Sequence, residues 1–351
     1  MPGRIYLGTR ASAQRGALLD KASIEKLAES ATLEELLNRL KATPYSDALS
    51  DLGPPLTATK LELNLRRRLD KVHYDLMEAA AKYRLIQLYY LKHIAWDLKS
   101  VLKSKALGKS YAESINYLDM KAEELVGRRE LIVKVLSASD IQEGVALLSG
   151  TEFHADIEKA AASFSATGEV RFFDIYVDHA VLAGISEAYS SESKLYSSSR
   201  TIDVAGIGEI VAIDIDAYNV VSVLRAKLWG LPSREVQSLL VTPAFRVPTS
   251  VLMKMIGSES VSDAVKQIQQ IYPTDMEGQT SDEDTIDAVE KVFTNRMKAT
   301  LAKTFLWQKL GPAYALALIK LLEFEVNNLA AIAVGVEAGM SSKDIVSKLC
   351  L

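Results

Sequence analysis

Two short sequence patterns alternate three times each along this chain, and the alternation constrains the fold more than any other feature. The first is a Ser/Thr cap before an apolar helical stripe, and it begins at Ser30, Ser137 and Ser258. The second is a polar-headed helix with a Gly stop, and it runs over residues 97–108, 219–230 and 328–339. Internal repeats decide the whole architecture of a chain, so the alternation predicts a triplicated fold.

The spacing of the two patterns makes the repeat credible. Leu33, Ile141 and Val261 of the first pattern lie 108 and 120 residues apart. The glycines of the second pattern lie 122 and 109 residues apart. A capped apolar stripe alone is common in helical proteins, but two patterns in the same order are much harder to obtain by chance. We therefore predict three helical repeats, at residues 1–125, 126–250 and 251–351.

Helical periodicity dominates the chain. Apolar residues from Leu65 to Tyr83 follow the i, i+3, i+4, i+7 rule of one buried stripe. They predict a single long helix from about Leu61 to Leu107 that stops at Gly108, since glycine accepts the left-handed conformation past a helix end. Further long helices are expected over 110–136 and 155–195. The fold class predicted is all-α, well above the usual helical share of about one third.

Composition excludes several classes of protein. The chain has 351 residues, 48% of them hydrophobic and 25% charged, as in an ordinary soluble globular protein. Its formal net charge of −4 argues against nucleic-acid binding. The one cysteine, Cys350, allows no disulfide within the chain and fits a reducing cytoplasm. With no secretory pattern and no apolar run near the roughly 20 residues that span a bilayer, we expect membrane contact only through a partner.

Signals for catalysis are weak. Gly108-Lys109-Ser110 has the tail of a phosphate-binding loop, but Lys103 occupies the place of the required first glycine, so a helix stop is favoured. Cys350 has no evident base beside it in the sequence. No metal-ligand spacing links the histidines, which we interpret as ordinary helix residues: His73, His93, His154 and His179. We predict no catalytic residue, no cofactor and no metal site.

A pair of acidic residues recurs in the second and third repeats. Asp214 and Asp216 precede the second pattern of the second repeat, and Glu323 and Glu325 precede that of the third. We interpret this recurrence as helix capping and as complementarity of a carboxylate with the helix dipole at a helix start.

The polar positions of the second pattern are the candidate binding residues. Two interpretations stay open. One is a polar helix face, or an Asn that bonds a neighbouring helix to hold the register. The other is three related polar faces that surround one axis and bind a partner there. The candidates are Asp97, Asn219 and Asn328, the equivalent cations Lys103 and Arg225, and the equivalent cations Lys105 and Lys227.

These residues resemble a known family, the C subunits of A-type (V-type) ATP synthases, which are related to the d subunits of vacuolar ATPases. The resemblance covers almost the whole chain and rests on the order and spacing of several segments: residues 6–10 with Leu18-Leu19, 30–45, 216–230 and 325–332. The chain departs from the pattern where Asp97 replaces the usual Asn. It departs again where Val334 and Val336 stand in place of Arg225 and Lys227.

The resemblance implies three pseudo-threefold-related helical bundles that form a funnel with a central cavity. It also implies a non-catalytic central-stalk subunit of a rotary ATPase, peripheral on the cytoplasmic face of the membrane. The implied partners are the rotor-shaft subunits and the membrane ring of proteolipid subunits. Such a subunit seats the shaft on the ring and transmits torque between ATP hydrolysis or synthesis and proton or sodium transport. The valines of the third repeat imply a socket that binds unequally on its three sides.

Two other classes compete with this interpretation. A helical-repeat adaptor of another assembly is one, although repeats of about 110 residues are long against solenoid units of about 20–45. An all-α enzyme is the other, and it would need a cluster of titratable groups with perturbed pKa values in a pocket. The sequence offers no candidate set for that cluster.

Overall fold

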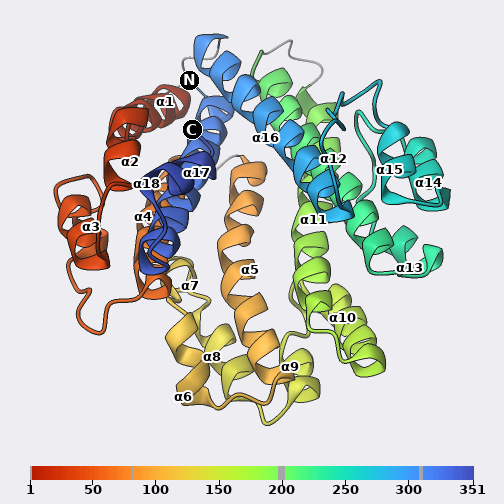
Figure 1. Cartoon of the computed structure of the whole chain (residues 1–351), viewed down its shortest axis with the longest axis horizontal. Coiled ribbons are helices and arrows are strands. Elements are labelled where there is room, and N and C mark those ends of the chain that lie inside the picture. The colour runs from red at the N-terminus through yellow and green to blue at the C-terminus, as the bar shows by residue number, and fades with distance from the viewer. Residues whose placement is uncertain (1, 81–82, 197–201, 308–310) are drawn as a thin grey trace. The chain divides into compact units, whose positions relative to one another are not determined.

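The computed structural model describes residues 2–80, 83–196, 202–307 and 311–351. Every regular element in these ranges is a helix, as Figure 1 shows, so the predicted all-α fold is confirmed. The chain divides into two compact units: unit 1 combines Met1–Gly150 with Leu310–Leu351, and unit 2 is Thr151–Lys309. The repeat boundaries at residues 125 and 250 stay a prediction.

Unit 1 holds the N-terminal helices together with the last two helices of the chain. Its elements are α1 (Pro2–Arg15), α2 (Lys21–Leu27), α3 (Leu33–Leu40), η1 (Asp47–Leu49), α4 (Ala58–Ala79), α5 (Arg84–Ala106), α6 (Tyr111–Ser114), η2 (Ile115–Tyr117), α7 (Lys121–Leu125), α8 (Arg129–Ser137), α9 (Ile141–Leu147), α17 (Pro312–Glu337) and α18 (Ser342–Ser347).

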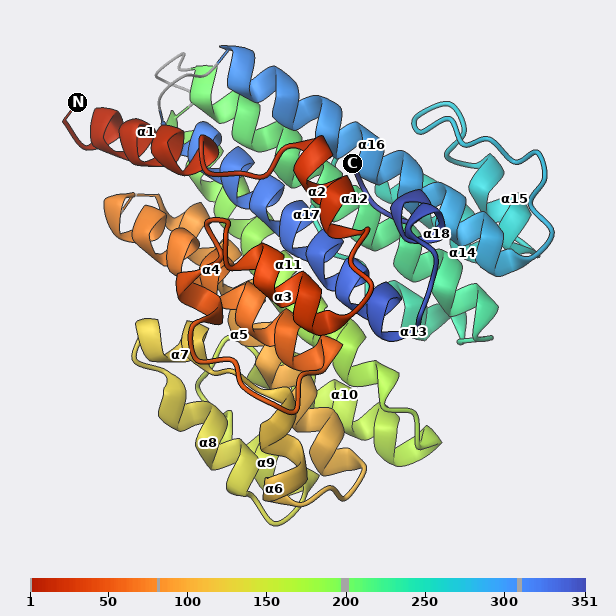
Figure 2. The same ribbon diagram turned by 60° about the vertical axis from the view of Figure 1, so that its left-hand side comes forward.

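Helix α17 forms the centre of unit 1. It packs along α4 and also contacts α1, α2 and α3, and Figures 1 and 2 both show it beside α4. Its segment 312–319 is buried at every position, as expected of a helical segment that is apolar all round. The core of unit 1 therefore joins helices that lie some 250 residues apart in the chain.

The prediction of one helix from Leu61 to Leu107 is wrong. Helix α4 ends at Ala79, the backbone of Tyr83 is extended (φ −108°, ψ 91°), and α5 begins at Arg84. The two helices pack on each other. No glycine or proline lies between 61 and 107, and both helices bury apolar residues. The periodicity therefore continues through the break without a breaker residue to mark it.

Unit 2 is built on the long helices α12 and α16. These two lie side by side in both views, and α14 and α15 pack on α12. Helix α11 packs on α10 and on α12. The elements of unit 2 are α10 (His154–Thr167), α11 (Arg171–Tyr196), α12 (Ile202–Leu228), α13 (Ser233–Ser238), α14 (Thr249–Gly257), α15 (Val261–Lys266) and α16 (Asp282–Trp307).

Both repeated patterns fold the same way in all three places. The stop glycines Gly108, Gly230 and Gly339 have φ of +66°, +67° and +68°. After each of them, one backbone N–H donates across the helix end over 2.9 Å: Lys109 to Ser104, Leu231 to Ala226 and Met340 to Gly335. This is the Schellman ending, which a left-handed glycine permits. The predicted helix stops are confirmed.

The first pattern begins a helix each time with a side-chain cap. Thr32, Asp140 and Ser260 are the N-caps of α3, α9 and α15. Each accepts the backbone N–H three residues on, over 2.9–3.2 Å. Such a cap satisfies one of the N–H groups that the first helical turn leaves without a partner.

Candidate functional site

The repeated asparagines of the second pattern bind the backbone of their own repeat. Asn219 Nδ2 donates to the carbonyl of Val241 over 3.0 Å, and Val241 N–H donates back to Asn219 Oδ1 over 2.8 Å. Asn328 makes the same pair with Cys350, over 3.0 and 2.8 Å. In both cases the partner lies 22 residues further on, and both amides are buried. We call this arrangement the amide clamp.

Asp97 occupies the clamp position in the first repeat with a different side chain. Its Oδ2 accepts the N–H of Met120 over 3.0 Å, 23 residues further on, so the accepting half of the clamp is kept. An ionised carboxylate has no proton to donate, so the donating half is missing. The carboxyl group of Asp97 instead interacts electrostatically with that of Glu123, which is fully buried.

The lysines of the second pattern close the ends of neighbouring helices. Lys105 Nζ donates to Ala138 O over 2.6 Å, just past α8. Lys227 Nζ donates to Ile256 O over 3.0 Å and to Ser258 O at the end of α14. A cation at a helix C-terminus satisfies the last carbonyls and complements the helix dipole. These contacts assign both lysines a structural role within the chain.

The third repeat has Val336 at the corresponding position, where its side chain is buried. In repeat one, the short helix before the first pattern is α2, and a different residue binds the carbonyl at its C-terminus. Arg39 of α3 donates to Lys26 O at the end of α2 over 2.5 Å and also pairs with Glu35. A cation from the same short segment therefore replaces the lysine of the preceding long helix.

Arg225 is the most exposed of the seven candidate residues. Its guanidinium pairs with Glu290 of α16 over 2.5 Å, and the two side chains are 48% and 37% exposed. An ion pair at such an exposure contributes about 0–1 kcal/mol to stability. Its equivalents differ: Lys103 is half-buried, and Val334 is 55% exposed.

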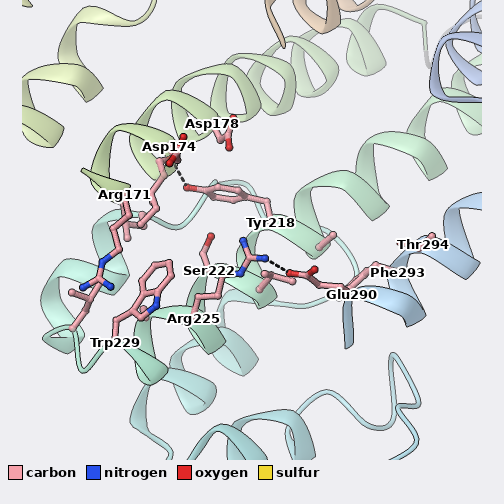
Figure 3. Close-up of a pocket in the computed structure, with 16 residues that line it drawn as sticks. Arg171, Asp174, Asp178, Tyr218, Ser222, Arg225, Trp229, Glu290, Phe293 and Thr294 are labelled. Carbon is pink, nitrogen blue, oxygen red and sulfur yellow. Dashed lines mark hydrogen bonds and ion pairs between the residues drawn. The ribbon is translucent and has the colours of Figure 1, made fainter. Parts of the chain in front are cut away.

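Arg225 also lines a cavity of ≈ 620 Å³ within unit 2, between α11, α12 and α16. Figure 3 shows Arg225 and Glu290 on one side and the Arg171–Trp229 contact on another. The Arg171 guanidinium lies 4.6 Å from the centre of the Trp229 ring, and Tyr218 Oη donates to Ile175 O over 3.3 Å. The cavity therefore combines aromatic faces with charged groups of both signs.

Sequence reasoning missed a second repeated site, formed by the acidic residues. Asp216 accepts the N–H groups of Arg246 (3.2 Å) and Val247 (3.3 Å) and the hydroxyl of Tyr272 (2.9 Å). Glu325 accepts the N–H of Leu19 (2.6 Å) and the hydroxyl of Tyr45 (2.7 Å). We call these contacts the α12 joint and the α17 joint.

The two joints are equivalent in sequence. Val247 lies 14 residues before Val261, and Leu19 lies 14 residues before Leu33, while each tyrosine ends its copy of the first pattern. In each joint, a long helix therefore holds a segment that ends in a copy of the first pattern. Helix α12 holds residues 246–272, which we call the head of repeat three although this segment begins before the predicted boundary at residue 250. Helix α17 holds residues 19–45, which we call the head of repeat one.

The interpretation of these acids as helix-start residues is wrong. Asp216 lies in the middle of α12 and Glu325 in the middle of α17, and both are buried. Burial raises the pKa of each carboxyl, and the hydrogen bonds that it accepts oppose that shift. Burial and the neighbouring Glu325 likewise hold the pKa of Tyr45 above its usual value, so the tyrosine stays a donor.

The first repeat lacks the acid of the joints, and the second repeat lacks the tyrosine. Three residues before the clamp position, the first repeat has Ile94 where the others have Asp216 and Glu325. At the end of the first pattern, the second repeat has Phe153 where the others have tyrosine. The acid and the hydroxyl are thus lost together, and both apolar replacements are buried.

Two of the histidines, His73 and His93, are buried and bind each other. His93 Nδ1 lies 2.9 Å from Asp70 Oδ1, and His73 Nδ1 lies 2.8 Å from His93 Nε2. Burial lowers the pKa of His73 to about 3, so this imidazole stays neutral. Among the described residues, no group of three or more His, Cys, Asp or Glu is arranged to hold a metal ion.

Comparison with known proteins identifies the family of the chain. The chain matches the model of the ATP synthase (C/AC39) subunit family over residues 7–348 and belongs to that family.

Individual relatives are similar over most of their lengths. The A-type ATP synthase C subunit of Methanothermobacter thermautotrophicus is 25% identical over 335 residues, 93% of this chain and 82% of the relative. The protein of the same name from Pyrococcus horikoshii is 27% identical over 93% of this chain and 85% of the relative. That from Methanocaldococcus jannaschii is 21% identical over 98% and 85%.

Long apolar helices such as α17 raise the question of membrane spans. Within the described ranges, no helix is both long and apolar enough to cross a bilayer.

Proposed function

We propose that this chain is a non-catalytic central-stalk subunit of a rotary ATPase of the A/V type. In this role it seats the rotor shaft on the membrane rotor ring and transmits torque between ATP chemistry and proton or sodium transport. It is peripheral on the cytoplasmic face of the membrane. The observation that carries the proposal is the family match over residues 7–348, and the relatives named as C subunits of A-type ATP synthases support it.

The internal contacts fit a mechanical part. Torque transmission needs segments that keep their positions under load. Each joint ties a head to a long helix through a buried hydrogen bond from a tyrosine hydroxyl, and the clamps fix the segment that follows each long helix. The three-bundle funnel with a central cavity remains part of the proposal.

Seven residues were predicted to bind a partner, and they are unequal probes of that role. Five of them already hold backbone groups of this chain: Asp97, Lys105, Asn219, Lys227 and Asn328. Changing any of these would alter folding as well as binding. Arg225 is half exposed on an ion pair that contributes little to stability, so it tests partner binding most directly.

A charge swap separates partner binding from structure. We expect Arg225→Glu to weaken capture of the chain by the isolated rotor-shaft subunits at least tenfold, because the guanidinium is lost and a carboxylate faces Glu290. The double variant Arg225→Glu/Glu290→Arg restores an internal ion pair with its polarity reversed. If the shaft contacts Arg225 itself, the double variant stays weak. Recovery in the double variant would give Arg225 a purely internal role.

The wider proposal has its own test. The isolated chain should hydrolyse no ATP, and a complex assembled without it should lose the coupling of hydrolysis to ion transport while its catalytic head stays active. Failure to bind either the shaft subunits or the ring, together with full coupling in its absence, would favour the adaptor of another assembly.

A further inference from the structure

The residue that Asp97 binds, Met120, has a strained backbone conformation that the partners of the other two clamps do not share. Met120, whose N–H binds Asp97, has φ of +55° and ψ of 16° and is buried. A residue other than glycine is strained in this region, and the conformation persists only where the surroundings hold it. The equivalent positions Val241 and Cys350 have no positive φ.

Three elements hold Met120 and α7 in place. Asp97 of α5 accepts the Met120 N–H, and Tyr90 of α5 donates to Ala122 O over 3.0 Å. Arg67 of α4 pairs with Asp119 over 2.5 Å. Glu123 itself has no exposed surface, and no donor in the described part of the chain reaches either of its carboxyl oxygens.

A buried carboxyl without a donor is stable only if it carries a proton. The carboxyl of Glu123 interacts electrostatically with that of Asp97, and the nearest other charges from the surrounding helices are mostly acidic. Asp70 of α4 is paired with His93, Asp119 is paired with Arg67, and Glu124 faces Arg129 at the surface. Burial and the neighbouring Asp97 raise the pKa of Glu123, and burial raises that of Asp97.

We propose that Asp97 and Glu123 form a proton-binding site, and that the bound proton latches segment 118–125 onto α4 and α5. Glu123 carries the proton and donates it to the Asp97 oxygen that does not bind Met120. The proton replaces, as hydrogen-bond donor, the amide N–H that Asn219 and Asn328 supply in the other repeats. When it leaves, two buried carboxylates repel each other and the strained segment opens. This inference does not depend on the proposed function.

The sign of the pH dependence follows from the direction of the shifts. A carboxyl whose pKa is raised in the fold above its ordinary value of 4.5 binds its proton more tightly in the closed state than in the open state. The latch is therefore fully stabilised below pH 4.5 and weakens as the pH rises toward the raised pKa of the closed state. One released proton changes the opening equilibrium by up to about tenfold for each pH unit in that window.

Hydrogen exchange of the full chain tests the latch. We expect the protection of amides in 118–125, corrected for intrinsic exchange, to fall by up to about tenfold per pH unit between about pH 6 and 8. Amides of 239–241, which the Asn219 clamp holds, serve as the reference in the same sample and should keep their protection. An equal fall in both segments, or none in 118–125, would overturn the proposal.

Two variants replace the proton by an amide. In Asp97→Asn, the amide accepts the Met120 N–H and donates to Glu123, and in Glu123→Gln it donates to Asp97. Both should flatten the pH dependence of 118–125 and raise its protection at about pH 8 by about tenfold or more. Asn219→Asp is the matched control and should make 239–241 sensitive to pH in the same sense. Retention of the full pH dependence in both amide variants would refute the proton site.

A monovalent cation could bridge two carboxylates in place of a proton. The same exchange experiment at about pH 8 is therefore run in sodium chloride, potassium chloride and choline chloride at equal ionic strength. Protection that is independent of the cation supports the proton, and protection that requires sodium or potassium overturns it.

Discussion

In the α12 joint, Asp216 accepts two backbone N–H groups and a tyrosine hydroxyl, whereas in the α17 joint Glu325 accepts one N–H group and a tyrosine hydroxyl. The α12 joint also has a second attachment, because Lys227 of the same helix closes the end of α14. In the α17 joint, Val336 stands at that position and Arg39 closes α2 from within the head. The head of repeat one is thus partly self-supporting, and the head of repeat three depends more on the helix that holds it.

The largest effect that would test this difference is loss of the joint carboxyl. We expect Asp216→Ala to lower the free energy of unfolding by about 3–5 kcal/mol, because three donors, two of them buried, lose their acceptor. Glu325→Ala leaves two donors without an acceptor and should cost about 2–4 kcal/mol. Urea denaturation followed by circular dichroism measures both. Equal losses, or the larger loss at Glu325, would break the ranking of the joints.

The tyrosine hydroxyls sharpen the comparison at smaller cost. Tyr272→Phe and Tyr45→Phe each remove one donor and keep the ring, so each should cost about 1–2 kcal/mol. The two losses should be similar, because each hydroxyl binds one carboxyl over 2.9 or 2.7 Å. A double-mutant cycle of Tyr272→Phe with Asp216→Ala should show coupling, and strictly additive losses would contradict the joint.

The C-termini of the short helices α14 and α2 should depend on different cations, Lys227 and Arg39. Lys227→Met should cost about 1–2 kcal/mol, because two carbonyls at the end of α14 lose a cation. Arg39→Met should cost about 0.5–1 kcal/mol, since its contact with Lys26 O is more exposed. Amide exchange within α14 and α2 reports each loss locally. Fraying of α2 in the Lys227 variant would contradict the assignment.

A further small effect concerns the ends of α12 and α17. A Cβ atom on Gly335 would lie 2.6 Å from Ile345 Cγ1, whereas the equivalent Ala226 already carries one. We expect Gly335→Ala to cost about 1 kcal/mol, since crowding outweighs the better helix propensity of alanine. In the background of Ile345→Ala the same change should cost nothing or stabilise. An unchanged cost in that background would show that Ile345 is not the obstacle.

Local features of this fold could be predicted from the sequence. The caps before α3, α9 and α15 and the stops at Gly108, Gly230 and Gly339 depend on residues within one helical turn, so each pattern carries its own signal. The equivalence of Asp97, Asn219 and Asn328 was also visible, and the structure adds that each binds a backbone group 22 or 23 residues later.

The joints and the break in the first long helix could not be predicted in the same way. An acid inside an apolar helix is indistinguishable from a surface residue when its partners lie 306 and 280 residues away, as those of Glu325 do. The recurrence of Asp216 and Glu325 with a tyrosine at the end of the first pattern was the available signal. Histidines likewise gave no spacing to recognise, because His73 and His93 meet only where α4 and α5 pack on each other.

The position of α17 in the chain has a consequence for biosynthesis. Residues 151–309 form a compact unit of consecutive segments, so unit 2 can assemble as soon as it has left the ribosome. Helix α4 is made long before α17, the helix that covers it. The part of α4 that α17 covers must therefore stay exposed, or be shielded by a chaperone, until the segment Leu310–Leu351 emerges. A ribosome stalled before α17 would therefore carry a folded unit 2 and an incomplete unit 1 that exposes apolar surface of α4.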